Sequence, residues 1–247
     1  MVRTVAIVPA RGGSKGLPGK NIASFCGAPL IAWSIAAGLA ARTAQRVICS
    51  TDDETIRDLA ISAGAEAPFL RPVEFAADHS TDLELFRHAL LWFRDNEGYI
   101  PEIVVQLRPT TPLRHAHWVD DCVEMLLADP SASSVRSVTP AHPTPYKMWK
   151  RGEDSVLTPL LTLEGIPEPF NMPRQSLPEA WWQTAHIDVI RSETILAGSM
   201  TGSKILAYPV SSHLSVDIDT EADFELSQAT AKVYWDEIVR PDTAARG

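Results

Sequence analysis

The sequence predicts an α/β protein in which helices flank a mainly parallel sheet. The apolar run 5–8 is typical of a strand buried on both faces of a parallel sheet, and further strands are expected at 46–50 and 102–107. Apolar residues recur at helical spacing in the intervening segments 29–41 and 83–93. With 247 residues and 45% hydrophobic content, the chain can bury a full core as one domain.

The first strand leads into a glycine-rich basic loop. Pro9 ends the strand because it has no N–H to give to a neighbour. The loop interleaves four glycines with three cations: Gly12, Gly13, Gly16 and Gly19 with Arg11, Lys15 and Lys20. Glycines let backbone N–H groups approach an anion and the cations neutralise it, so the loop predicts a phosphate site. It is not a Walker A loop, because Ser14 stands where that motif needs glycine.

Charge and composition narrow the ligand class. The net charge of −9 argues against non-specific nucleic-acid binding. Residues 1–51 nevertheless hold six Lys or Arg and no Asp or Glu, which suits a small polyanion. No apolar run approaches the roughly 20 residues of a membrane span, and a strand begins almost at the first residue, so we expect neither a membrane partner nor a signal peptide. Three cysteines without metal-ligand spacing predict a reducing cytoplasm.

Acidic residues follow the second strand. Thr51 and Glu54 predict a capping box for a helix through Ala63. Asp52 and Asp53 lie just past the carboxyl end of this strand, where open α/β sheets place ligands. Capping and a direct ligand role remain open for these two residues.

A second acidic pair lies near the end of the chain. Asp217 and Asp219 are two residues apart, so in an extended segment both side chains point to one face. Two hard oxygen anions near a phosphate loop predict a Mg²⁺ site. The alternative is that Asp219 only helps to cap the next helix, which begins at a Thr220–Asp223 capping box and is expected to run to about 239.

The segment from about 140 to 185 differs from the rest of the chain. It is rich in Pro, Trp and Met, after a strand expected at 133–138. Its large apolar side chains need a partner surface: Met148, Trp149, Phe170, Trp181 and Trp182. We therefore predict one domain over residues 1–247, with an excursion from the sheet at about 140–185.

Four segments resemble the signatures of the acylneuraminate cytidylyltransferases, the CMP-sialic acid synthetases and their nonulosonate relatives. These segments are 9–21, 107–114, 173–175 and 215–220. The resemblance implies a Rossmann-like nucleotidyltransferase fold with a small dimerisation arm, and therefore a homodimer, which the cysteine content places in the cytoplasm. It implies an enzyme that transfers CMP from CTP to the anomeric hydroxyl of a sialic-acid-like sugar acid and releases pyrophosphate, with Mg²⁺ as cofactor.

The resemblance also assigns roles to residues. Arg11, Lys20 and Asp217 are implied as catalytic, and Asp217 with Asp219 as metal ligands. Implied nucleotide-binding residues are Ala10, Arg11, Gly12, Gly13, Ser14, Lys15, Lys20 and Asn21. Implied sugar-binding residues are Arg108, Thr110, Thr111, Lys147, Arg174, Gln183 and His186.

Two departures from the family pattern leave alternatives open on the acceptor side. Arg108 stands where the sialate enzymes usually have Gln, and residues 181–190 keep the strand pattern but change its polar groups. A guanidinium forks onto carboxylate or phosphate, whereas an amide reads a hydroxyl or a base edge. The acceptor could instead be another keto-sugar acid or a sugar 1-phosphate, with GTP as a possible donor. A surface salt bridge for Arg108, and a non-catalytic nucleotide-binding module, are the blander alternatives.

Overall fold

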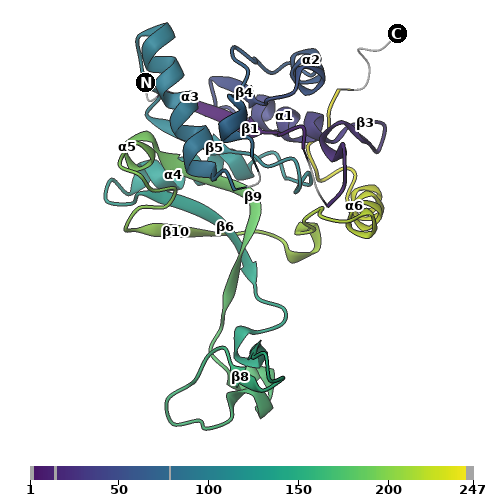
Figure 1. The fold of residues 1–247 in the computed structure, drawn as a ribbon, viewed down its shortest axis with the longest axis vertical. Helices are drawn as coiled ribbons and strands as arrows, with labels where there is room; N and C mark the ends of the chain where they lie inside the picture. The colour runs from purple at the N-terminus through teal and green to yellow at the C-terminus, as the bar shows by residue number, and fades with distance from the viewer. Residues whose placement is uncertain (1–2, 14–15, 78, 243–247) are drawn as a thin grey trace. The chain divides into compact units, whose positions relative to one another are not determined.

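The fold is built around a six-stranded sheet. The computed structural model describes residues 3–13, 16–77 and 79–242. The strands lie in the order β10-β6-β9-β5-β1-β4 (Figure 1). In chain order, their bounds are β1 Thr4–Pro9, β4 Arg46–Ser50, β5 Ile103–Gln106, β6 Ser134–Pro140, β9 Trp181–Arg191 and β10 Ile205–Pro209.

The first strand lies between two parallel neighbours. β1 pairs in parallel with β4 on one side and with β5 on the other, whereas β9 runs antiparallel to β5. All residues of β1 before Pro9 are buried. This confirms the predicted buried strand, and the mainly parallel sheet is confirmed with an antiparallel neighbour at β9.

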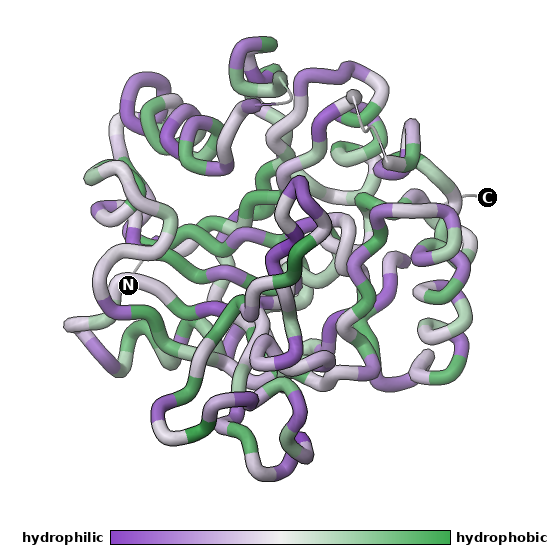
Figure 2. Tube along the Cα trace, turned by 60° about the horizontal axis from the view of Figure 1, so that its bottom comes forward, coloured by the Kyte–Doolittle hydropathy of each residue, from purple (hydrophilic) through white to green (hydrophobic). Residues whose placement is uncertain are grey.

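Helices cover both faces of the sheet. Their bounds are α1 Leu30–Ala40, α2 Glu54–Ser62, α3 Asp82–Glu97, α4 Trp118–Ala128, α5 Ser192–Leu196 and α6 Glu221–Val233. Side chains alternate along β1, so Ala6 and Val8 join one hydrophobic core and Val5 and Ile7 the other. The first core is closed by α1, α2, α4 and α6, the second by α3 and α5. Figure 2 shows hydrophobic stretches along the central strands.

Two details at helix ends differ from the sequence prediction. Helix α2 is capped by Asp53, whose carboxylate accepts the backbone N–H of Ile56 at 2.9 Å. The Thr51–Glu54 capping box is therefore wrong: Thr51 is still held at the end of the strand, where its carbonyl accepts the N–H of Arg71. Helix α6 begins with the predicted Thr220–Asp223 capping box but ends at Val233 rather than near 239. The chain turns there and Trp235 packs edge-on against Trp33.

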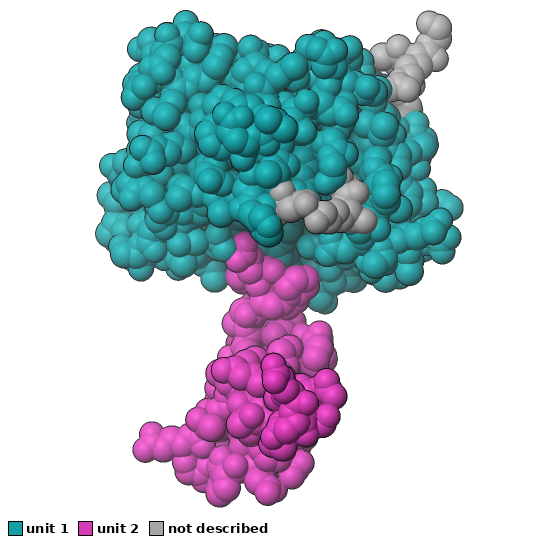
Figure 3. Space-filling model, viewed as in Figure 1, with its two compact units in different colours: residues 1–137, 184–247 teal, residues 138–183 magenta. Residues whose placement is uncertain are grey.

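The chain divides into two compact units (Figure 3). The first comprises residues 1–137 and 184–247, and the second comprises residues 138–183. The second unit contains the antiparallel pair β7 (Trp149–Arg151) and β8 (Leu157–Pro159), together with three short 3-10 helices. A small hairpin, β2 (Ser24–Phe25) and β3 (Ala28–Pro29), precedes α1 in the first unit. Within the described ranges, no helix is both long and apolar enough to cross a membrane.

Candidate functional site

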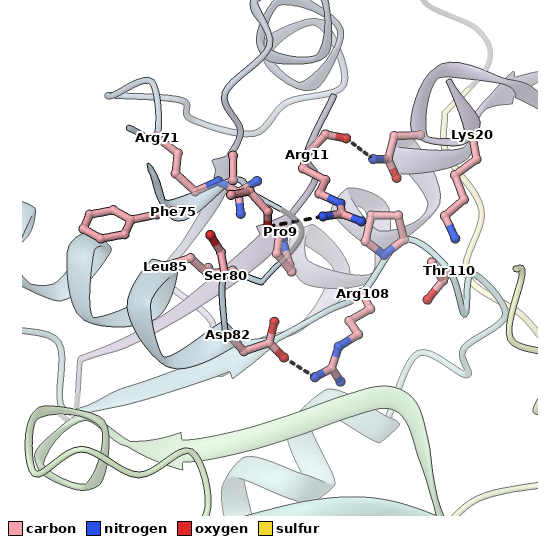
Figure 4. A pocket seen from close by; sticks show the side chains of 14 residues that line it. Pro9, Arg11, Lys20, Arg71, Phe75, Ser80, Asp82, Leu85, Arg108 and Thr110 are labelled. Atoms are coloured by element: carbon pink, nitrogen blue, oxygen red, sulfur yellow. Dashed lines mark hydrogen bonds and ion pairs between the residues drawn. The ribbon is translucent and has the colours of Figure 1, made fainter. Parts of the chain in front are cut away.

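A cavity of about 340 Å³ lies at the carboxyl ends of β1 and β5, in the first unit (Figure 4). This is the edge at which open α/β sheets bind ligands. The wall comes from three segments: the end of β1 with the loop after it, the chain from Arg71 into the start of α3, and the chain after β5. The lining residues are Pro9, Arg11, Lys20, Asn21, Arg71, Phe75, Ala76, Ala77, Ser80, Asp82, Leu85, Arg108, Pro109 and Thr110.

The most buried cation of this wall is Arg71. It is only 5% exposed, and its Nε and Nη2 atoms have no hydrogen-bond partner among the described residues. The nearest carboxylate oxygen belongs to Asp52, 3.8 Å from Nη2. Burial lowers the pKa of Arg71, and the neighbouring charge of Arg11 lowers it further. A buried guanidinium with unpaired N–H groups on a cavity wall is suited to bind a polar or anionic ligand.

The basic loop is fixed to the end of β4. The backbone N–H of Gly12 donates to Oδ1 of Asp52 at 3.1 Å. A Cβ on Gly12 would lie 2.9 Å from Oδ2 of Asp53, so glycine is needed for this close approach. Asp52 therefore holds the loop and Asp53 caps α2, which accounts for both acidic residues with contacts inside the chain.

The other loop residues of the predicted nucleotide site take different positions. Asn21 donates through Nδ2 to the carbonyl of Arg11 at 3.0 Å and lines the cavity. Ala10 is buried and its N–H donates to the carbonyl of Ser50. A Cβ on Gly13 would meet only open space. Ser14 and Lys15 lie outside the described residues.

Lys20 connects the loop to the acidic pair near the C-terminus. Its Nζ donates to the carbonyl of Ile218 at 2.6 Å and lies 3.4 Å from Oδ1 of Asp219. Its side chain is only 11% exposed. A Cβ on Gly16 would lie 2.4 Å from the carbonyl oxygen of Asp219, so the loop backbone also touches this segment. The structure thus brings together residues that are almost 200 positions apart in the chain.

The acidic pair has a donor set that suits a hard divalent cation. Oδ1 of Asp217 is buried without a hydrogen-bond partner among the described residues. Burial raises the pKa of Asp217, while a hydrogen bond from the Thr110 side chain opposes that shift and the charge of Asp219 adds to it. The described residues contain no group of three or more metal-ligating side chains. Two carboxylates fit a Mg²⁺ ion that completes its octahedron with phosphate oxygens and water.

Arg108 forms ion pairs, as the salt-bridge alternative expected, but with partly and fully buried partners that the sequence did not indicate. Its Nη1 donates to Oδ2 of Asp188 at 3.0 Å, and its Nη2 donates to Oδ2 of Asp82 (Figure 4 shows the contact with Asp82). Gln106 also donates to Oδ2 of Asp82, at 3.0 Å. The two carboxylates raise the pKa of Arg108 against the opposing effect of burial. The guanidinium reaches the cavity wall with its charge already balanced.

The backbone beside Arg108 is fixed as well. The carbonyl of Arg108 accepts hydrogen bonds from the buried Arg114 guanidinium and from the Ser34 hydroxyl. Burial lowers the pKa of Arg114 to about 9. Arg114 also donates to the carbonyl of His186 at 2.8 Å. The strand exit that carries Arg108 is thus held at both its side chain and its backbone.

The predicted sugar-binding residues are dispersed. Thr110 lines the cavity, but Thr111 is buried. His186 is fully buried: its Nε2 contacts the carbonyl of Leu214 and its ring packs edge-on against Trp118. The prediction that His186 lines a sugar pocket is therefore wrong, because this face of β9 points into the core.

Three predicted sugar-binding residues belong to the second unit. Lys147, Arg174 and Gln183 are all exposed there. Arg174 contacts the His142 ring through Nη1 and lines a separate cavity of about 450 Å³ within that unit.

Sequence reasoning missed Arg71, Asp82 and the Phe75 wall. Arg71 stands before a proline in a stretch of irregular pattern, which gave no sign that its side chain is buried. Asp82 lies in the first turn of α3, where acidic residues are common because their negative charge interacts favourably with the helix dipole. The sequence gave one indication of these residues, which is their place in the chain: the segment between β4 and β5 must return past the carboxyl edge of the sheet.

A comparison with protein families shows to which family the chain belongs. The family model described as cytidylyltransferase matches residues 5–147, which is more than half of the chain and includes every residue named above as lining the cavity. This chain belongs to the cytidylyltransferase family. The resemblance read from the loop and the strand exits is confirmed at this level, whereas the acidic pair lies outside the matched residues.

Individual relatives of this cytidylyltransferase chain agree. CMP-N,N'-diacetyllegionaminic acid synthase of Legionella pneumophila is 35% identical over 154 residues, covering 62% of this chain and 64% of that protein. N-acylneuraminate cytidylyltransferase of Escherichia coli is 31% identical over 225 residues, covering 91% of this chain. This chain spans only 51% of that longer relative.

A solved structure supports the fold. CMP:2-keto-3-deoxy-manno-octonic acid synthetase, complexed with CTP, superposes with a TM-score of 0.69 and covers 94% of this chain and 99% of its own. Its sequence identity is 16%, so the likeness concerns the fold alone.

Proposed function

We propose that this protein transfers CMP from CTP to the anomeric hydroxyl of a nonulosonic acid and releases pyrophosphate. The observation that carries the proposal is the cavity at the carboxyl edge of the sheet, which Arg11, Lys20 and Arg71 line. Arg11 and Lys20, the cations of the glycine-rich loop in this lining, suit a triphosphate. The names of the Legionella and Escherichia relatives support a cytidylyl donor and a nonulosonic acceptor.

In the proposed reaction, the anomeric oxygen attacks the α-phosphorus of CTP. A bond forms between these two atoms, the bond from the α-phosphorus to the bridging oxygen breaks, and pyrophosphate leaves. Arg11 and Lys20 stabilise the negative charge that develops on the α-phosphoryl oxygens and on pyrophosphate. We assign no general base among the described residues, so the hydroxyl proton passes to water.

Arg71 is proposed to bind the nucleotide before the reaction rather than to stabilise the charge that develops in the transition state. Arg71 lines the same cavity as Phe75, Ala77 and Ser80, and its Nε and Nη2 have no hydrogen-bond partner among the described residues. A buried donor pair beside an aromatic ring can read acceptor atoms of a base or ribose while the ring excludes water.

Asp217 and Asp219 are proposed to hold Mg²⁺. When bound, the ion would neutralise phosphate charge and lower the pKa of the attacking hydroxyl. Thr110 orients Asp217 through its hydroxyl hydrogen bond, and this leaves Oδ1 available. Removal of divalent ions with EDTA is expected to abolish turnover.

The acceptor residues are proposed in two groups. Lys147 and Arg174 are proposed to bind the acceptor carboxylate, and Gln183 is proposed to bind the sugar as well. Arg108 is charge-balanced by Asp82 and Asp188, so we propose that its remaining N–H groups donate to uncharged acceptor oxygens.

The test is pyrophosphate release with Mg²⁺. CTP, GTP, UTP and ATP are each combined with sialic, legionaminic, pseudaminic and octulosonic acids and with hexose 1-phosphates. Turnover with CTP and one nonulosonic acid is the expected result. Turnover only with a sugar 1-phosphate or another nucleotide would contradict the substrate assignment and favour the alternative suggested by Arg108. Tight CTP binding without turnover on any acceptor would favour a non-catalytic binding module.

We further propose a homodimer in the cytoplasm. The second unit exposes large apolar side chains, among them Trp149, Leu157 and Trp181, which a partner surface would cover. Light scattering should report a dimer mass for the wild type and a monomer mass for Leu157→Asp. An unchanged mass for this variant would exclude that surface. All three cysteines are free, which is consistent with a reducing compartment.

A further inference from the structure

We propose that Lys20 is the counter-ion of the Asp217–Asp219 pair in the nucleotide-free protein, and that a divalent cation must displace its ammonium. The inference rests on the proposed function in taking this pair as the metal site. It adds a second role for Lys20, which the proposed reaction uses only for phosphate. One side chain would then connect metal binding to nucleotide binding.

Oxygen atoms of the acidic segment lie around the Lys20 ammonium. Its Nζ lies 2.6 Å from the Ile218 carbonyl oxygen and 3.4 Å from Oδ1 of Asp219, and its charge also acts on Asp217. Carbonyl and carboxylate oxygens are the ligands that hard cations prefer. The ammonium therefore occupies the electrostatic position that a divalent ion would need.

The Lys20 side chain can move while the loop backbone around it is held in place. A Cβ on Gly16 would lie 2.4 Å from the carbonyl oxygen of Asp219, so the loop backbone is already in close contact with the acidic segment. Asn21 anchors the other side of Lys20 by donating to the carbonyl of Arg11. The backbone on both sides is held, whereas the lysine stem has four rotatable bonds. Displacement of Lys20 is thus a side-chain movement that leaves the loop in place.

A bound nucleotide would provide an alternative partner for the Lys20 ammonium. Lys20 lines the same cavity as Arg11 and Arg71, so phosphate there would give the ammonium a new anion when it leaves Asp219. Metal and nucleotide would then each favour the binding of the other, because both favour the displaced lysine. Such coupling is reciprocal by thermodynamic necessity.

The experiment measures metal affinity without nucleotide and without turnover. Mn²⁺ is titrated into the full-length, nucleotide-free protein and free Mn²⁺ is followed by electron paramagnetic resonance. Lys20→Met should bind Mn²⁺ at least about threefold more tightly than the wild type, the size expected when one partly exposed charge is removed beside the site. Lys20→Arg should stay close to the wild type.

Two controls isolate the effect. Arg71→Met removes one positive charge from the same cavity, but the carboxylate near Arg71 is Asp52, 3.8 Å from Nη2, and not the acidic pair, so this variant should not tighten Mn²⁺ binding. Asp217→Asn added to Lys20→Met should abolish the tightening, because the pair is then broken. Circular dichroism verifies the fold of each variant.

A second readout follows Lys20 itself. An amine-modifying reagent and mass spectrometry measure the labelling rate of each lysine with and without Mn²⁺. Labelling of Lys20 should rise at least about threefold when Mn²⁺ binds, whereas Lys204, paired with Asp129 at 2.6 Å, should not change. No change at Lys20 under saturating Mn²⁺ would overturn displacement.

Equal, weaker or absent Mn²⁺ binding by Lys20→Met would also overturn the inference. These outcomes are separable from a failure of the proposed function. Wild-type turnover with CTP, combined with unchanged Mn²⁺ affinity in Lys20→Met, refutes only the counter-ion role. Tighter Mn²⁺ binding by Lys20→Met, combined with no turnover by the wild type on any nucleotide–acceptor pair, refutes only the proposed reaction.

Discussion

The Arg108 guanidinium donates a 3.0 Å hydrogen bond to a carboxylate of Asp188 that is fully buried. Nε of Arg136 lies 3.6 Å from the other oxygen of the same carboxylate. Burial raises the pKa of Asp188, and the two guanidinium groups act in the opposite direction. Together with Asp82, these residues form a chain of alternating charges beneath the cavity. A buried network of this kind fixes geometry more than it adds stability.

Breaking this chain should destabilise the fold. Asp188→Ala leaves two guanidinium groups without their shared buried partner, so we expect a loss of about 3 kcal/mol in the free energy of unfolding, measured with urea. In contrast, Asp95→Ala removes an exposed partner of Arg94 and should cause no measurable change. A loss for Asp188→Ala no larger than that control would show that the network is not structural. Arg108→Gln combined with Asp188→Ala should cost less than the sum of the single changes.

Arg71→Met should weaken nucleotide binding. The variant removes the unpaired Nε and Nη2 donors from the cavity wall while keeping most of the buried stem. Charge-assisted hydrogen bonds contribute roughly 1.5–3 kcal/mol, so we expect the Kd for CTP to rise about tenfold to a hundredfold by calorimetry. Arg57→Met, on α2, serves as a control for the loss of one charge. Equal affinities for the two variants would remove Arg71 from the site.

Asp217→Asn should separate catalysis from folding. We expect kcat to fall by roughly a hundredfold or more, because a metal-binding carboxylate is lost. Burial and the charge of Asp219 raise the pKa of Asp217, so its ionised form destabilises the folded state at neutral pH. The variant should therefore melt at or above the wild-type temperature. A lower melting temperature or near-normal turnover would contradict the assigned role.

His186 should make the protein sensitive to mild acid. Burial, reinforced by the charge of Arg114, lowers its pKa to about 3, against about 6.5 in the unfolded chain. The unfolded state therefore binds the proton first, and the stabilising effect of neutral His186 is fully present above pH 6.5 and lost as the pH falls toward 3. For one such group the loss is about 2 kcal/mol between pH 7 and pH 5.

The measurement for His186 is a difference between two proteins. Unfolding free energies of the wild type and His186→Gln are compared at pH 7 and pH 5, because other acids titrate in both. Glutamine keeps an N–H donor for the Leu214 carbonyl but does not titrate. We expect the gap between the two proteins to shift by about 2 kcal/mol toward the variant at pH 5. Parallel pH dependence in the two proteins would assign the acid sensitivity elsewhere.

Local sequence pattern was enough to predict the elements on which the site is built. The buried run before Pro9, the basic glycine loop and the Thr220–Asp223 capping box each depend on neighbours within a few residues. Their structure is therefore encoded where they stand in the chain. Residue type and spacing also led to the predictions of a phosphate site at the loop and a metal site at the acidic pair.

Only the tertiary structure decided which side chains meet. Arg108 pairs with carboxylates 26 and 80 positions away, and Lys20 reaches Ile218 across 198 positions. Arg71 and His186 are polar residues whose burial the sequence did not indicate, and both are buried in the structure. Periodicity and propensity describe one segment at a time, whereas burial and charge pairing depend on which strands become neighbours. The tertiary fold therefore decided that Lys20 of the basic loop lies beside Asp219 of the acidic pair.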